Sequence, residues 1–210
     1  MIESIRLGSG TWGALDSPTH EPLTVFVKEL ALNSTPNQVC DLFEINGLVP
    51  VPLHVRVVES GTKSFAFCLL ATPELCRRAL ATRFLLGSKL HSPTISKASK
   101  KGYPLSLGQC ESLLNHHLPL QWSSKADVKP IRPPPGGVEG AAAKQRAIIS
   151  VSLFAESEPV VSTSLMFEQQ GEADELIGEL KRAVTIATHQ AMGKIELLFL
   201  GGTKPVMRRL

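Results

Sequence analysis

The sequence predicts an α+β fold made of two small domains joined by a linker. Residues 22–101 alternate strand-like and helix-like patterns in the order βαββαβ, and residues 145–210 give a shorter series in the order ββαβ. Between them the chain becomes rich in proline and glycine, which is typical of linkers. The 210 residues, 43% of them hydrophobic and 20% charged, are enough for two packed cores.

The first domain is predicted from its alternating patterns and its helix starts. Helices are expected after Thr35 and Thr72, because each threonine can cap a helix and is followed by a proline. Strands are expected over residues 23–30, 53–59 and 63–71, and over residues 86–95 as an edge strand because of Pro93. This order is the ferredoxin-like split βαβ plan, in which two helices pack on one face of a four-stranded antiparallel sheet.

The rest of the chain is expected to be simpler. Residues 1–21, rich in Gly, Ser, Thr and Pro, are expected to form a flexible leader. Residues 102–144 are expected to connect the domains, with a short helix over 105–118 followed by the Pro/Gly-rich linker. The small α+β domain of residues 145–210 should hold a hairpin (148–155 and 160–169), a helix (174–190) and a third strand (194–200).

Residues 63–70, KSFAFCLL, resemble the octamer signature of the RNA recognition motif (RRM) family. Residues 25–30, VFVKEL, resemble the hexamer signature of the same family, and residues 35–49 are similar to its first helix. The resemblance covers about residues 22–101 and implies a domain that binds single-stranded RNA on its sheet. Two departures are informative: Ser64 replaces the usual glycine, and Leu69 is apolar where a polar residue is common, which favours a covered sheet.

The residues support an RNA-binding face independently of the resemblance. Because side chains alternate along a strand, Phe65 and Phe67 share one face, and Phe26 points away from the valines on either side of it. If the helices cover the valine side, the three rings stand on the open face, where unpaired bases can stack on them. Lys63, and Lys28 or Arg56 at the sheet edge, can neutralise phosphates.

The charge distribution also favours RNA. Residues 22–101 carry ten basic and five acidic residues, a net charge of +5, against +3 for the whole chain. Lys97, Lys100 and Lys101 follow the last predicted strand, where the exiting chain can cross the sheet and contact phosphates. The predicted RNA-binding set is therefore Phe26, Phe65, Phe67, Lys63, Lys28, Arg56, Lys97, Lys100 and Lys101.

The sequence contains no pattern of a catalytic centre, metal site or cofactor site, so an enzyme is not expected. Its four cysteines lack metal-ligand spacing and suit a reducing intracellular compartment, without choosing between nucleus and cytoplasm. No membrane partner is expected, because no apolar stretch is long enough for a span.

Two other functions remain open. One is a protein-interaction module on the same fold; a protein partner could also bind through residues 145–210. The other is the non-catalytic N-terminal part of a larger RNA-processing enzyme such as an RNA polymerase. The solvent exposure of the three phenylalanines separates these from RNA binding.

Overall fold

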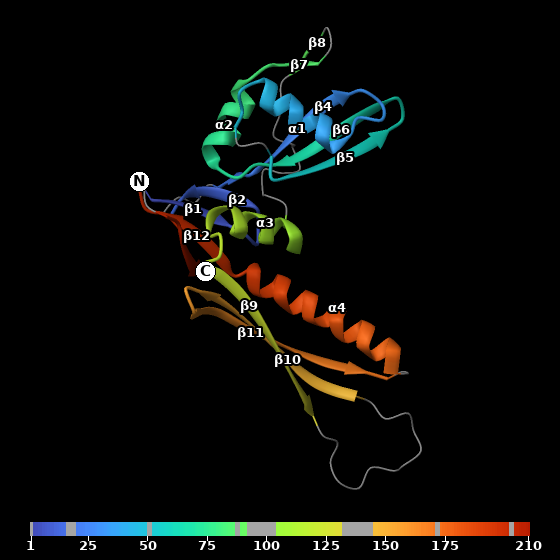
Figure 1. Cartoon of the computed structure of the whole chain (residues 1–210), viewed down its shortest axis with the longest axis vertical. Helices are drawn as coiled ribbons and strands as arrows, with labels where there is room; N and C mark the ends of the chain where they lie inside the picture. The colour runs from blue at the N-terminus through green and yellow to red at the C-terminus, as the bar shows by residue number, and fades with distance from the viewer. Residues whose placement is uncertain are drawn as a thin grey trace.

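The structure is a computed structural model that describes residues 2–15, 20–49, 52–86, 89–91, 104–131, 145–170, 173–201 and 204–210. The fold is α+β, as predicted. Its described strands form a five-stranded sheet, two three-stranded sheets and a two-stranded hairpin, and every pairing is antiparallel. Figure 1 shows the three larger sheets following one another along the long axis of the molecule, with the five-stranded sheet in the middle.

The upper sheet contains the strands of the predicted RNA-binding face, in the order β4-β6-β5. Two helices, α1 and α2, lie on one side of it (Figure 1), over the fully buried Val25, Val27, Ala66 and Cys68. The elements are β4 (Thr24–Leu30), α1 (Pro36–Ile45), β5 (His54–Ser60), β6 (Lys63–Leu69) and α2 (Pro73–Ala81). These three strands and two helices confirm the predicted ones.

Both helices of this unit begin where the sequence predicts. The Thr35 hydroxyl accepts from the Gln38 N–H at 3.3 Å, and the Gln38 side chain accepts from the Thr35 N–H at 2.9 Å, so α1 has a complete capping box. The Thr72 hydroxyl accepts from the Leu75 N–H at 3.2 Å at the start of α2. The caps satisfy backbone donors that have no partner within the helix.

The predicted fourth strand does not join this sheet in the part of the chain that the structure describes. Instead β7 (Phe84–Leu86) and β8 (Lys89–His91) pair only with each other. Phe84 is fully buried and its ring packs edge-on against Phe43 of α1, with 4.9 Å between ring centroids. This contact holds β7 at the helix layer. Residues 92–95 of the predicted strand lie outside the described residues.

The expectation of a flexible leader is wrong for the described part of residues 1–21. Strands β1 and β2 form a hairpin, and β1 pairs with β12 from the far end of the sequence. Ile5, Leu7 and Trp12 are buried there, and this burial offsets the entropy lost on ordering the segment. The sheet, in the order β13-β12-β1-β2-β3, contains β1 (Glu3–Arg6), β2 (Thr11–Ala14), β3 (Glu21–Pro22), β12 (Ile195–Phe199) and β13 (Val206–Arg209).

The lower sheet confirms the predicted hairpin and helix and corrects the connector. Strands β10 (Gln145–Ala155) and β11 (Glu158–Gln169) form the hairpin, and α4 (Ala173–Met192) is the helix. The connector contains α3 (Leu107–His117), as expected, but also the ten-residue strand β9 (Trp122–Ile131), which pairs with β10. Hydrogen bonds to β10 satisfy backbone groups of β9, although this strand contains two lysines and one proline. The third predicted strand forms as β12 but belongs to the middle sheet.

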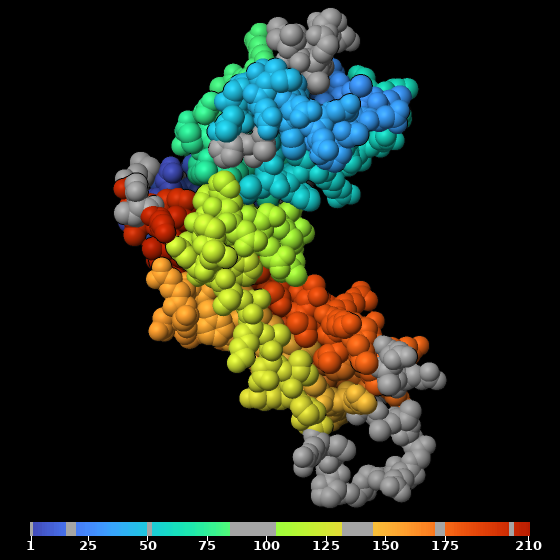
Figure 2. Space-filling model, in the orientation of Figure 1, coloured from blue at the N-terminus to red at the C-terminus, as the bar shows by residue number. Residues whose placement is uncertain are grey.

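Helix α3 packs between the upper and lower parts of the chain. Figure 2 shows its yellow-green surface between the cyan upper sheet and the orange lower part. His117 hydrogen-bonds through Nε2 to the Ala71 carbonyl at 2.8 Å, and His189 of α4 bonds the Leu105 carbonyl at 2.6 Å. Cys110 and Leu113 of α3 are fully buried and belong to one apolar cluster that also includes residues of all three larger sheets.

Candidate nucleic-acid interface

Three phenylalanine rings form a cluster on the face of the upper sheet that α1 and α2 do not cover. Phe26 of β4 lies directly opposite Phe67 of β6. Phe65 precedes Phe67 by two residues, so its ring lies on the same face. The ring centroids are 5.2 Å apart for Phe26 and Phe65, 5.2 Å for Phe26 and Phe67, and 5.7 Å for Phe65 and Phe67. The predicted grouping of these rings on one face is confirmed.

The cluster is half-buried, so the face is partly open. Each of the three rings keeps an intermediate exposure and packs against the other two. Leu69, on the same face at the end of β6, is buried, which means that this end of the face is covered. Leu69, whose apolar side chain predicted a covered sheet, therefore lies in the covered part of this face.

Arg56 extends the row of aromatic side chains across the sheet. It lies on β5 directly opposite Phe67, so Phe26, Phe67 and Arg56 stand side by side on three neighbouring strands. Arg56 is exposed, and its guanidinium has no hydrogen bond or ion pair in the described ranges. A guanidinium beside aromatic rings provides both positive charge and a flat stacking surface.

The two lysines of the predicted set lie near a bulge in β4. The register shifts between Val27 and Leu30, and Glu29 adopts φ 57°, which inserts one extra residue into the strand. Lys63 is 64% exposed with its Nζ 3.6 Å from Glu29 Oε1, and Lys28 is also exposed. Exposed ion pairs contribute only about 0–1 kcal/mol, so Lys63 can exchange this carboxylate for a phosphate.

The three remaining predicted residues, Lys97, Lys100 and Lys101, lie outside the described residues. Their contribution to the interface stays a prediction.

A cavity of about 290 Å³ adjoins the aromatic cluster and brings in residues that sequence reasoning missed. The sheet provides Thr24, Arg56 and Phe67, and the other lining residues are Pro104 and Leu105, just before α3, and Gln109 in its first turn. The Ser-x-x-Gln pattern at Ser106 signals the start of a helix. No local pattern tells which strand that helix start will meet.

The start of α3 is capped in the same way as α1. The Ser106 hydroxyl accepts from the Gln109 N–H at 3.4 Å, and the Gln109 Oε1 accepts from the Ser106 N–H at 2.9 Å. Gln109 is therefore held in place at the cavity, with its oxygen accepting one hydrogen bond from the helix cap.

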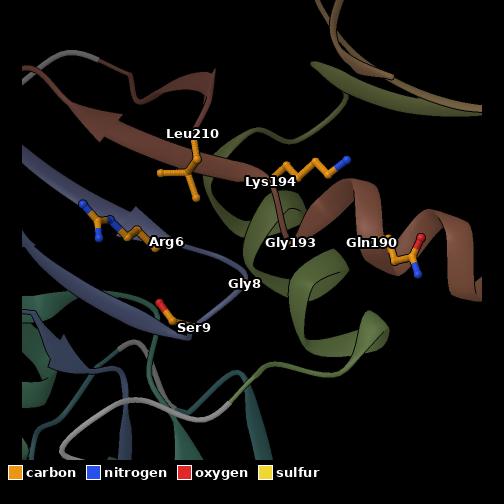
Figure 3. A pocket seen from close by; sticks show the side chains of 7 residues that line it. All are labelled: Arg6, Gly8, Ser9, Gln190, Gly193, Lys194 and Leu210. Atoms are coloured by element: carbon orange, nitrogen blue, oxygen red, sulfur yellow. The ribbon is translucent and has the colours of Figure 1, made fainter. Parts of the chain in front are cut away.

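A larger hollow of about 460 Å³ lies beside the middle sheet, but its polar groups do not converge. In Figure 3 the side chains of Arg6 and Lys194 point away from each other. The Lys194 ammonium donates to the Thr163 hydroxyl at 3.4 Å, outside the hollow's lining. We therefore assign it no chemistry.

The described residues contain no group of three or more His, Cys, Asp or Glu side chains that could hold a metal ion. The cysteines are free; Cys68, Cys76 and Cys110 are buried, and Cys40 is half-buried. Burial raises the pKa of the Cys76 and Cys110 thiols to about 12, which suppresses the reactive thiolate. Among the described helices, none is long and apolar enough to cross a membrane.

Comparison with known proteins gives no relative: no family model, no curated protein and no solved structure matches the chain. The interpretation of the aromatic face therefore depends on its geometry and chemistry alone.

Proposed function

We propose that this chain binds single-stranded RNA on the aromatic face of its upper sheet. The observation that carries the proposal is the cluster of Phe26, Phe65 and Phe67 on the face that α1 and α2 leave uncovered, in line with Arg56, whose guanidinium has no partner within the described residues. We interpret strands β4, β6 and β5 with α1 and α2 as part of a ferredoxin-like unit of RRM type. Their order and the side of the sheet that the helices cover support this interpretation.

The physical argument concerns aromatic surface that the fold leaves partly exposed to solvent. Rings used only for stability are expected to be fully buried, as Phe43 and Phe84 are in the same unit. The three clustered rings are not, although their neighbours on the opposite face are completely buried. Nucleobases can cover such surface by stacking, at about 1–3 kcal/mol per base.

The test is RNA affinity measured by fluorescence anisotropy with a labelled single-stranded 12-nucleotide RNA of mixed sequence. Phe65→Leu keeps most of the apolar volume but removes the aromatic face. We expect it to weaken binding about 5- to 150-fold, the equivalent of one lost stack of about 1–3 kcal/mol, with little change in thermal midpoint. Phe154→Leu is the matched control, because Phe154 is a half-buried phenylalanine on a strand of the lower sheet. It should leave RNA affinity unchanged.

Salt dependence gives a second readout of the same site. Each phosphate neutralised in a single-stranded complex contributes a slope of about −0.7 in the log–log plot of affinity against salt. Lys28 and Lys63 together predict a slope of about −1.4, and Lys28→Gln should reduce its magnitude by about 0.7. Undetectable RNA binding at low salt, or a Phe65→Leu variant that binds like the parent, would reject the proposal and favour a protein-binding face.

A further inference from the structure

We infer that the cavity between the aromatic face and the start of α3 holds one base of the bound RNA and selects guanine over adenine. This inference rests on the proposed RNA binding and adds a base preference to it. It depends on the cavity's position, its size and the hydrogen-bonding groups around it.

The position and size of the cavity suit a single base at the end of the stacking surface. Phe67 belongs both to the aromatic cluster and to the cavity wall, so a strand of RNA that crosses the rings reaches the cavity next. The volume of about 290 Å³ is near the lower limit of small-molecule sites, which span about 300–1,000 Å³. Phe67, Pro104 and Leu105 give it apolar walls suited to a planar ring.

Among the described residues that line the cavity, the polar side chains offer mainly hydrogen-bond donors. The Arg56 guanidinium has five N–H donors and no acceptor. The Gln109 Oε1 already accepts from the Ser106 N–H with one of its two lone pairs, while its NH₂ group makes no hydrogen bond within the described residues and can donate to a ligand. The Leu105 carbonyl already accepts a hydrogen bond from His189. The Thr24 hydroxyl can serve as either donor or acceptor.

A donor-rich cavity discriminates between the two purines. Guanine presents O6 and N7 as adjacent acceptors, which a guanidinium recognises with two hydrogen bonds. Adenine presents its N6 amino group at the position of O6, so donor would face donor in a partly desolvated site. In single-stranded RNA these edges are free to be read.

The experiment compares two 12-nucleotide RNAs that are oligouridine except for one central guanosine or one central adenosine. The parent protein should bind the guanosine probe about 5- to 150-fold more tightly, the range of one bidentate contact. Gln109→Glu replaces the NH₂ donor by an acceptor and keeps a residue that can complete the capping box. It should reduce the guanosine-to-adenosine ratio by about threefold or more, without lowering the thermal midpoint.

A matched control exists in the other capping box. Gln38→Glu makes the same chemical change at the start of α1, away from the cavity, and should leave the ratio as in the parent. The ratio of the two affinities is the readout, because an added negative charge weakens the binding of both probes equally.

The outcomes separate this inference from the proposed function. Equal affinity for both probes, or a Gln109→Glu ratio like the parent's, would overturn the guanine site even where Phe65→Leu confirms RNA binding. Absence of binding to either probe would overturn both. A guanosine preference that falls in Gln109→Glu and persists in Gln38→Glu supports the inference.

Discussion

Replacing Ile5 with alanine should destabilise the upper and lower parts of the chain together. Ile5 is 0% exposed, on a strand that pairs with β2 on one side and β12 on the other. Truncating a fully buried isoleucine costs about 2–5 kcal/mol, including the cavity it leaves. For a chain of this length, that lowers the thermal midpoint by about 4–20 °C.

The assay is hydrogen–deuterium exchange read in peptides from β6 and from β10. Their most protected amides exchange through global unfolding if both sheets share one cooperative unit. A loss of about 2–5 kcal/mol should then accelerate both sets by about 30-fold to a few thousandfold. Ile2→Ala is the control, because Ile2 lies next to the same strand and is 43% exposed. It should change exchange little.

The refuting result is exchange that accelerates in only one of the two sheets. The upper and lower parts would then unfold independently, and the shared apolar cluster across α3 would not couple them. A fragment ending near residue 125 tests the same point, because it lacks β12 and should therefore expose Ile5 and lose its stability.

Two further predictions concern titratable groups. Thiol labelling of the native protein should modify the half-buried Cys40 before the three buried cysteines, and denaturation should make all four react; equal native rates would contradict the burial seen here. Burial lowers the pKa of His117, against the opposing hydrogen bond to Ala71, so the unfolded chain binds the proton first as the pH falls. Stability should decrease as the pH falls below about 6.5, and the thermal midpoint should depend less on pH in His117→Gln; an unchanged pH dependence would show that this histidine contributes nothing.

Part of the candidate site follows from the sequence alone. The alternation of side chains places Phe65 and Phe67 on one face, and the structure groups them with Phe26 and beside Arg56. The cavity residues Leu105 and Gln109 were missed, because their nearness to Arg56 depends on how α3 packs and not on any local pattern.

The sequence by itself determined the elements whose signals are local. These are the capped starts of α1 and α2, the strands β4, β5 and β6, the β10–β11 hairpin, and α4. Such signals act over a few residues, through capping groups, turn residues and periodic burial. Only the tertiary structure decided which strands pair. The segment after Met1 becomes a strand because β12, almost the whole chain length away, offers it hydrogen bonds and a buried face. β7 and β8 pair with each other instead of with β4, so the predicted fourth strand is absent from the upper sheet over its described residues. Pairing and burial depend on partners that are distant in sequence, and one strand's residues do not specify them.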